Sequence, residues 1–141
     1  MKSIFSFLEN KFPVLSNFGR LAEDYLFTDP NSCLMKLGMI GETIVNLIFD
    51  YDHVPAPINN TAINRISALI REGLLTKETT DILHAIRKAR NKAVHENYAS
   101  VEDSKILLKM AYDLCGWFFQ TYGDWSYSPK SFVLPVEEVT E

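Results

Sequence analysis

The chain has 141 residues, 47% of them hydrophobic and 23% charged, which is typical of one soluble globular domain and excludes wholesale disorder. The formal net charge of −4 argues against a dedicated duplex-DNA binder, which is usually basic overall, but it leaves room for a local basic patch. No signal peptide is evident, and the longest apolar run, residues 37–49, is interrupted by polar residues and is too short to span a bilayer. We therefore expect a cytoplasmic protein with no membrane partner.

The first half of the chain predicts three helices. A segment of about residues 3–11 ends before Pro13, and a second helix of about residues 14–27 has apolar side chains at helical spacing. Asp29 and Pro30 suit the N-cap and the first position of a third helix, which runs to about Tyr51. The next nine residues hold two prolines and two asparagines, and they indicate a loop.

The second half predicts three more helices. The fourth covers about residues 61–72 and stops at Gly73, which is a good residue to end a helix. Thr76 can cap the fifth helix, which runs to about residues 95–97, and Ser100 opens a sixth that ends near Gly123. No segment alternates with period two, so we expect an all-α fold of about six helices without a substantial sheet.

The helical pattern breaks down after residue 123. The remaining residues include two prolines and three glutamates, and they resemble an interdomain linker in composition. We therefore expect one helical domain at residues 1–123, followed by a linker at 124–141 that leads toward a missing downstream region.

Two cysteines, Cys33 and Cys115, lie inside apolar helical stretches. They have no C-x-x-C spacing and no neighbouring pair of histidines. We expect two buried thiols in a reducing compartment.

The third predicted helix carries one charge, Glu42, in an otherwise apolar run. Such a helix belongs at the centre of the core, where Gly38 and Gly41 would let another helix approach closely. On the fifth helix, a rotation of about 100° per residue places Arg90 within an apolar face. A buried carboxylate needs a partner, and a guanidinium suits it. We therefore predict a mostly buried Glu42–Arg90 ion pair; the alternative is that Glu42 sits at the helix edge and reaches water.

The opposite side of the fifth helix is polar. It carries no acidic residue between its first and last members, and we call it the basic face. This face can be interpreted in two ways: as an ordinary solvated helix surface, or as a surface that contacts nucleic acid or a protein partner. Its members are His84, Arg87, Lys88, Asn91, Lys92 and His95.

Other kinds of site find little support. The histidines lack the spacing of metal ligands, so we expect no metal site. Glycine-rich phosphate loops and a Ser/His/Asp set are also missing from the sequence. We expect no cofactor in this part of the protein.

The segment from Arg90 to His95 has the form R-N-x-x-x-H and resembles the R-x4–6-H motif of the HEPN superfamily. The whole stretch from Leu83 to His95 resembles the signature helix of a HEPN-like domain of unassigned function, found at the N-terminus of type I restriction enzyme R subunits. The resemblance spans roughly residues 1–135. Its other elements are Asp29 to Leu34, Leu37-Gly38, Gly41-Glu42, Asn64 to Ile66, Arg71 to Leu75, Ala111 to Leu114 and Trp117 to Trp125.

This resemblance implies a HEPN-like helical bundle, often dimeric, that serves as an accessory module of a restriction and motor subunit. The full-length protein would be an ATP-dependent DNA translocase and endonuclease that uses ATP and Mg²⁺ and works with methylation and specificity subunits. The motifs for those activities are outside this chain, which we expect not to be catalytic. In HEPN ribonucleases the motif arginine and histidine cleave RNA without a metal across a dimer, which nominates Arg90 and His95 as catalytic residues.

Three functional hypotheses follow. The first is a docking or interaction module, whose interface could include five aromatic residues near the end of the last helix; the alternative is that they complete the core. The second is the metal-independent ribonuclease, and the third is nucleic-acid binding without chemistry through the basic face. The aromatic residues are Trp117, Phe118, Phe119, Tyr122 and Trp125.

Overall fold

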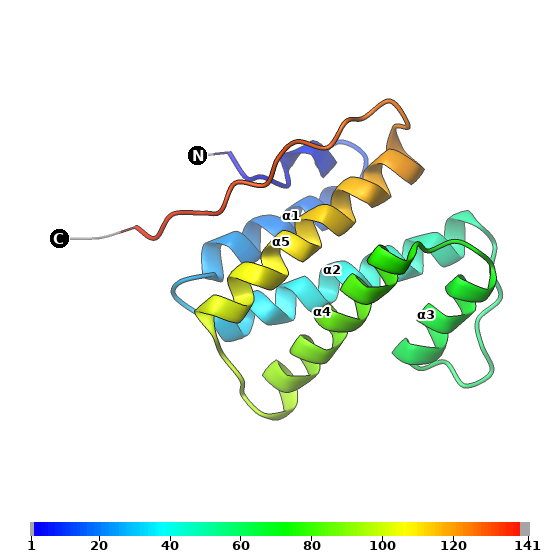
Figure 1. Ribbon diagram of the computed structural model, residues 1–141, viewed down its shortest axis with the longest axis horizontal. Helices are drawn as coiled ribbons and strands as arrows, with labels where there is room; N and C mark the ends of the chain where they lie inside the picture. Colours follow the sequence, from blue (N-terminus) through cyan, green and yellow to red (C-terminus); the bar gives the residue numbers. More distant parts are fainter. Residues whose placement is uncertain (1, 139–141) are drawn as a thin grey trace.

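A computed structural model describes residues 2–138 and shows an all-helical fold, with no strand in that part of the chain (Figure 1). Five α-helices form the domain, together with a short 3-10 helix near its beginning and a π-helical turn near its end. In chain order the elements are η1 (Ser6–Leu8), α1 (Pro13–Tyr25), α2 (Pro30–Tyr51), α3 (Ala62–Arg71), α4 (Lys77–His95), α5 (Val101–Phe118) and η2 (Phe119–Gly123).

Side-chain caps start four of the five α-helices, because the first backbone N–H groups of a helix lack partners within the helix. The Asp29 carboxylate accepts a hydrogen bond from the Ser32 N–H at 3.2 Å, and Pro30 follows as the first helical residue. Thr61 and Ser100 cap α3 and α5 in the same way. These three starts confirm the boundaries that the sequence predicts.

The first predicted helix is wrong as an α-helix. Residues 6–8 form only a single 3-10 turn, held by hydrogen bonds from the Ser6 and Leu8 N–H groups to carbonyls three residues earlier, each 3.1 Å long. An α-helix of this length is hard to nucleate, and the apolar contacts hold the tighter turn, since Phe5 and Leu8 are fully buried. Five α-helices, and not six, therefore make up the bundle within residues 2–138.

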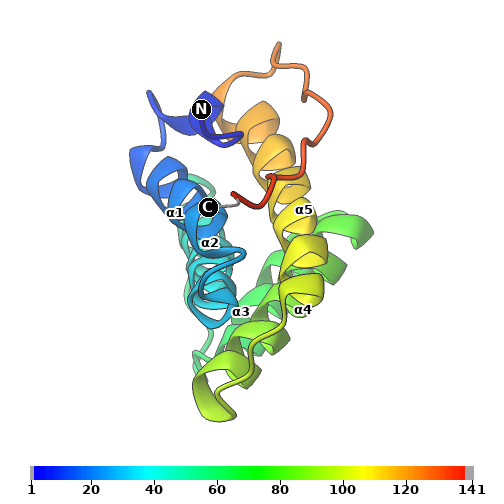
Figure 2. The same ribbon diagram turned by 90° about the vertical axis from the view of Figure 1, so that its left-hand side faces the viewer.

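The core is centred on α2, which packs against all four other α-helices. By length and composition alone α2 could cross a membrane, but ten of its residues, including Leu37 and Ile44, are buried within the bundle. Figure 2 shows α1 and α2 on one side and α5 crossing above α4 on the other. The third helix lies beyond α4 and contacts only α2 and α4 substantially (Figure 1).

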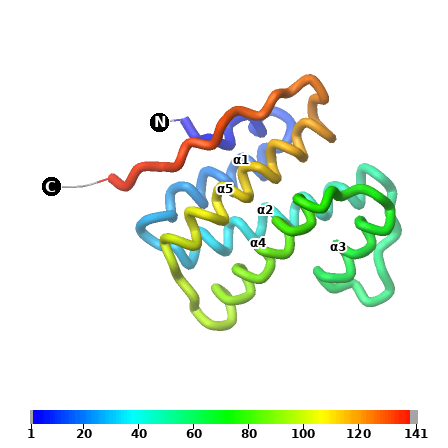
Figure 3. The backbone as a smooth tube through the Cα atoms, viewed as in Figure 1, coloured from blue at the N-terminus to red at the C-terminus, as the bar shows by residue number. Residues whose placement is uncertain are grey.

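The segment after η2 folds back along α5 and runs on the same side of the bundle as residues 2–10 (Figures 2 and 3). The Tyr112 hydroxyl donates a hydrogen bond to the Lys130 carbonyl at 2.9 Å, and the Phe132 ring packs at 5.5 Å from the Tyr112 ring. At least this part of the expected linker is thus packed on the helical domain. That it leads toward a further region stays a prediction.

Candidate functional site

Helix α4 carries most of the residues that the sequence nominates. It begins with a reciprocal capping box, in which Thr76 and Thr79 each accept a hydrogen bond from the other's backbone N–H. Its buried side chains, among them Leu83 and Ile86, pack against α2 at Gly41, where an added β-carbon would meet them at 3.6 and 3.5 Å. These are ordinary contact distances, so Gly41 is not needed for the approach of α4, and the close approach that the sequence predicts depends on Gly38.

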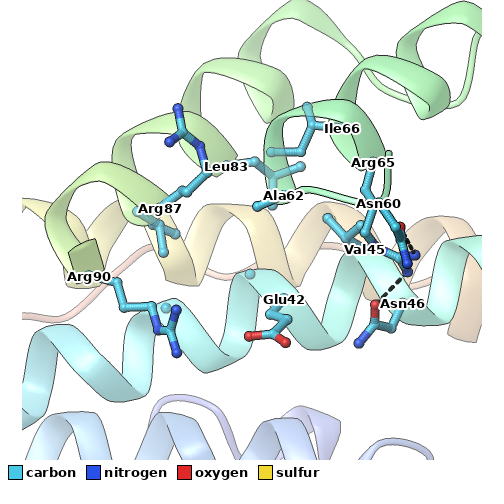
Figure 4. Close-up of a pocket in the computed structure, with 13 residues that line it drawn as sticks. Glu42, Val45, Asn46, Asn60, Ala62, Arg65, Ile66, Leu83, Arg87 and Arg90 are labelled. Carbon is cyan, nitrogen blue, oxygen red and sulfur yellow. Dashed lines mark hydrogen bonds between the residues drawn. The ribbon is translucent and has the colours of Figure 1, made fainter. Parts of the chain in front are cut away.

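The predicted Glu42–Arg90 ion pair is wrong in this structure. Glu42 is exposed and Arg90 is half-buried, and no ion pair within 4.0 Å joins them in the described part of the chain. Figure 4 shows their charged groups side by side along α2. The physical reason is that α2 keeps one solvent-facing stripe, which Glu42 shares with Asn46 and Asp50 at four-residue spacing. The carboxylate reaches water there and needs no buried partner.

Arg90 is positioned by Gly38 instead. A β-carbon built on Gly38 would fall 2.5 Å from both Cγ and Cδ of Arg90 and 2.7 Å from its Cβ. The aliphatic part of Arg90 therefore lies directly on the α2 backbone, and its guanidinium extends past it toward solvent, as long cationic side chains often do.

The basic face is present along α4, with its later members more open than its first ones. Lys88, Asn91, Lys92 and His95 are exposed, and His84 and Arg87 are half-buried. Partial burial lowers the pKa of His84, and the neighbouring Arg87 and Lys88 lower it further, so its imidazole is neutral near pH 7. Contact of this face with nucleic acid or a protein partner stays a prediction.

The end of α4 is tied to the start of α2. The Asn31 side-chain amide donates hydrogen bonds to the carbonyls of Ala93 at 2.9 Å and Tyr98 at 2.8 Å. The Lys92 ammonium lies 4.0 Å from the centre of the Tyr98 ring, a cation–π distance. Asn31 thus satisfies a carbonyl that the helix end leaves without a partner in the helix.

A pocket of about 240 Å³ opens between α2, α3 and α4 (Figure 4). The sequence pattern misses it because α3 contributes one wall, and the placement of α3 depends on tertiary packing. Arg65 on α3 donates hydrogen bonds to the Asn46 side chain at 2.6 Å and the Asn60 side chain at 3.0 Å, and it lies 4.1 Å above the Phe49 ring. The polar side chains that line the pocket are Glu42, Asn46, Asn60, Arg65, Arg87 and Arg90.

The aromatic residues near the end of α5 mostly complete the core. Phe118 is fully buried, Tyr122 stacks on its ring at 5.2 Å, and the Tyr122 hydroxyl donates a hydrogen bond to Asp52 at 2.5 Å. Trp117 and Phe119 are half-buried. Trp125 is the exception, at 86% exposed, so little of this cluster remains for an outside partner.

Arg90 and His95 lie on one uninterrupted helix. Five residues correspond to about 140° of helix rotation, so the two side chains leave α4 in different directions.

Both cysteine thiols are buried as the sequence predicts, and burial raises the pKa of Cys33 to about 12. Residues 2–138 contain no cluster of three or more histidine, cysteine or acidic side chains placed to hold a metal ion.

Comparison with known proteins places the chain in a family. A family model described as "Domain of unknown function (DUF4145)" matches residues 20–127. The type I restriction enzyme EcoKI endonuclease subunit of Escherichia coli (strain K12) is 26% identical over 139 residues, which cover 95% of this chain and 11% of that protein. The chain thus spans about a tenth of the length of this relative, and it is similar to a domain-sized part of a restriction enzyme subunit. No solved structure matches it. The family match covers well over half of the sequence, and the chain therefore belongs to the DUF4145 domain family.

Proposed function

We propose that this chain is an accessory docking module of a type I restriction enzyme endonuclease subunit. The observation that carries the proposal is the similarity of almost the whole chain to a small part of such a subunit. The rest of the longer protein would supply ATP-dependent DNA translocation and cleavage, with ATP and Mg²⁺. The methylation and specificity subunits, and DNA, would then be partners of that protein in the cytoplasm.

The basic face of α4 is the surface that we assign to docking, either on nucleic acid or on a partner subunit. Four of its six residues are exposed, and the α4 segment from His84 to His95 holds cations and no acid in a chain of net charge −4. Charge segregation of this kind favours an acidic partner surface or phosphates. The five-helix architecture is also compatible with the HEPN-like bundle that the sequence resembles, and we include that assignment in the proposal.

The test uses the full-length protein with its methylation and specificity subunits. The double variant Lys88→Glu/Lys92→Glu reverses two exposed charges of the basic face. Lys77→Glu on the first turn of α4 serves as the control, because its side chain is 90% exposed and is separated from the basic face along the helix by its ion-pair partner, the acidic Asp81. We expect the double variant to lose co-purification with the other subunits or to reduce DNA binding, and the control to keep both. Unchanged assembly, DNA binding and cleavage in the double variant would contradict docking through this face.

The alternative function is a metal-independent ribonuclease that acts through Arg90 and His95. Its support is the R-N-x-x-x-H motif together with the exposure of His95 at the end of α4. Because the two side chains diverge, a shared site would need the second copy of a homodimer. Cleavage of a fluorescent RNA in EDTA that disappears in His95→Ala would support this function. Equal cleavage by both proteins, or none by either, would exclude it.

A further inference from the structure

The pocket between α2, α3 and α4 has an unusual concentration of arginine. The chain has five arginines, and three of them, Arg65, Arg87 and Arg90, line this one pocket. Among residues 2–138, its only acidic lining residue is Glu42. The pocket therefore carries an excess of two positive charges, within a protein whose net charge is −4.

No ion pair within 4.0 Å joins these arginines to an acidic residue of the described chain, although the Glu42 carboxylate lies beside Arg90 in Figure 4. The four ion pairs of the described residues all join neighbours on the same helix elsewhere, such as Arg20 with Asp24. Arg65 donates instead to two neutral side-chain amides. Arg90 is held by packing on Gly38. The positive charge of the pocket is thus available to a ligand.

Arg87 gives a second and independent indication. Its Nε is buried and has no hydrogen-bond partner among residues 2–138, and one of its terminal nitrogens has only a long contact, 3.4 Å, to the His84 ring. Buried donors are normally paired, so the Arg87 guanidinium has hydrogen-bonding capacity that the described fold does not use. Figure 4 shows the Arg87 guanidinium pointing away from Glu42, with Arg65 and Arg90 toward the two ends of the pocket.

The size and charge of the pocket define the ligand class. Guanidinium groups match the geometry of phosphate and carboxylate oxygens. A phosphate monoester carries close to two negative charges near pH 7, which balances the excess of two better than one carboxylate does. The 240 Å³ volume lies just below the range of roughly 300–1,000 Å³ for drug-sized ligands. The walls also include apolar side chains such as Val45 and Leu83.

We propose that this pocket binds the phosphate group of a small organic phosphate monoester, with an arginine of its wall on the phosphate and the apolar walls on the organic part. Neither the docking function nor the ribonuclease alternative requires such a site. The same phosphate chemistry could come from a free metabolite or from the 5′-phosphate at the end of a nucleic acid, and the test separates these two sources.

Isothermal titration calorimetry of the full chain with AMP, adenosine and inorganic phosphate tests the phosphate requirement. We expect binding of AMP, weaker binding of inorganic phosphate and none of adenosine. Fluorescence anisotropy with a short DNA carrying a 5′-phosphate or a 5′-hydroxyl then identifies the source. Preference for the phosphorylated DNA over AMP assigns the site to a nucleic-acid end, and the reverse assigns it to a free ligand. Equal binding of adenosine and AMP, or no binding of any phosphate probe, would overturn the proposal.

Variants of the pocket provide the matched controls. Arg65→Gln and Arg87→Gln should each weaken AMP binding by about tenfold or more, because each removes a charge-assisted contact. Arg71→Gln, an exposed arginine of the same helix α3 outside the pocket, should bind as wild type does. Glu42→Gln should tighten AMP binding by roughly two- to fivefold, since it removes an exposed negative charge that repels the phosphate. Tighter AMP binding by Glu42→Gln cannot result from misfolding. The site would be refuted if Glu42→Gln bound AMP no more tightly than the wild type and if Arg71→Gln had the same affinity as Arg65→Gln and Arg87→Gln.

Discussion

Replacing Gly38 with alanine tests how closely α2 and α4 approach each other. The new β-carbon would lie 2.5–2.7 Å from three side-chain carbons of Arg90, whereas carbon atoms in contact are normally about 3.5–4.0 Å apart. A different rotamer of Arg90 can move its Cγ and Cδ away. Its Cβ is fixed by the α4 backbone, so the two helices must also separate.

The magnitude follows from comparison with Gly41→Ala on the same helix. A β-carbon on Gly41 would meet Ile86 and Leu83 at 3.5 and 3.6 Å, which is ordinary contact. Both alanines gain about 1 kcal/mol of helix propensity, so the difference between the two variants isolates the overpacking cost of roughly 1–3 kcal/mol. At roughly 3 °C per kcal/mol for a domain of this size, Gly38→Ala should melt about 3–9 °C below Gly41→Ala.

The assay is urea and thermal unfolding of both variants and the wild type, followed by far-UV circular dichroism. Gly41→Ala should equal or exceed the wild type in free energy of unfolding, and Gly38→Ala should fall below Gly41→Ala with an unchanged urea m-value. Equal midpoints for the two variants, or a more stable Gly38→Ala, would show that α2 and α4 are farther apart at Gly38 than the 2.5–2.7 Å contacts imply.

Three further predictions rest on single groups. Asn31→Ala removes two hydrogen bonds to backbone carbonyls and should lower the free energy of unfolding by about 1–3 kcal/mol in urea titrations, and no change would contradict the role of this amide. The fold lowers the pKa of His84, so as the pH falls below about 6.5 the unfolded chain binds a proton on this side chain before the folded chain does. The wild type should therefore lose stability relative to His84→Gln between pH 7 and 5, and a constant difference in the free energy of unfolding across that range would contradict this prediction. Both cysteines are buried, and the pKa of each thiol is raised by burial, so Ellman's reagent should react with neither until urea unfolds the protein; rapid reaction of the native protein would be the contrary result.

Features that depend on local sequence were predictable. Asp29 with Pro30, Thr76 and Ser100 mark helix starts because capping is decided within four residues. The basic face followed from helical periodicity alone, since all its members share one helix. The prediction of an α-helix in the first segment was wrong because burial of Phe5 and Leu8 against the rest of the bundle holds a 3-10 turn at residues 6–8.

The site residues show where such reasoning ends. The burial of Glu42 was mispredicted because the apolar run around it hides a solvent-facing stripe, although Asn46 and Asp50, at four-residue intervals, already carry that signal. Arg65 could not be assigned to the pocket, because the sequence does not show where α3 packs. The pairing of Arg65 with Asn60 and Asn46 spans two helices and a loop, and only the assembled fold brings these groups together.

The two hydrogen bonds of Asn31 also bear on motion. The last turn of a helix normally frays, because its carbonyls have no partners further along the helix. Here one amide at the first turn of α2 holds both a carbonyl of the last turn of α4 and a carbonyl of the connection that follows. His95 and the exposed end of the basic face are therefore attached to the central helix, and the last turn of α4 should open only together with the start of α2. Amide hydrogen exchange in those two turns would then occur as one cooperative unit rather than as two independent ends.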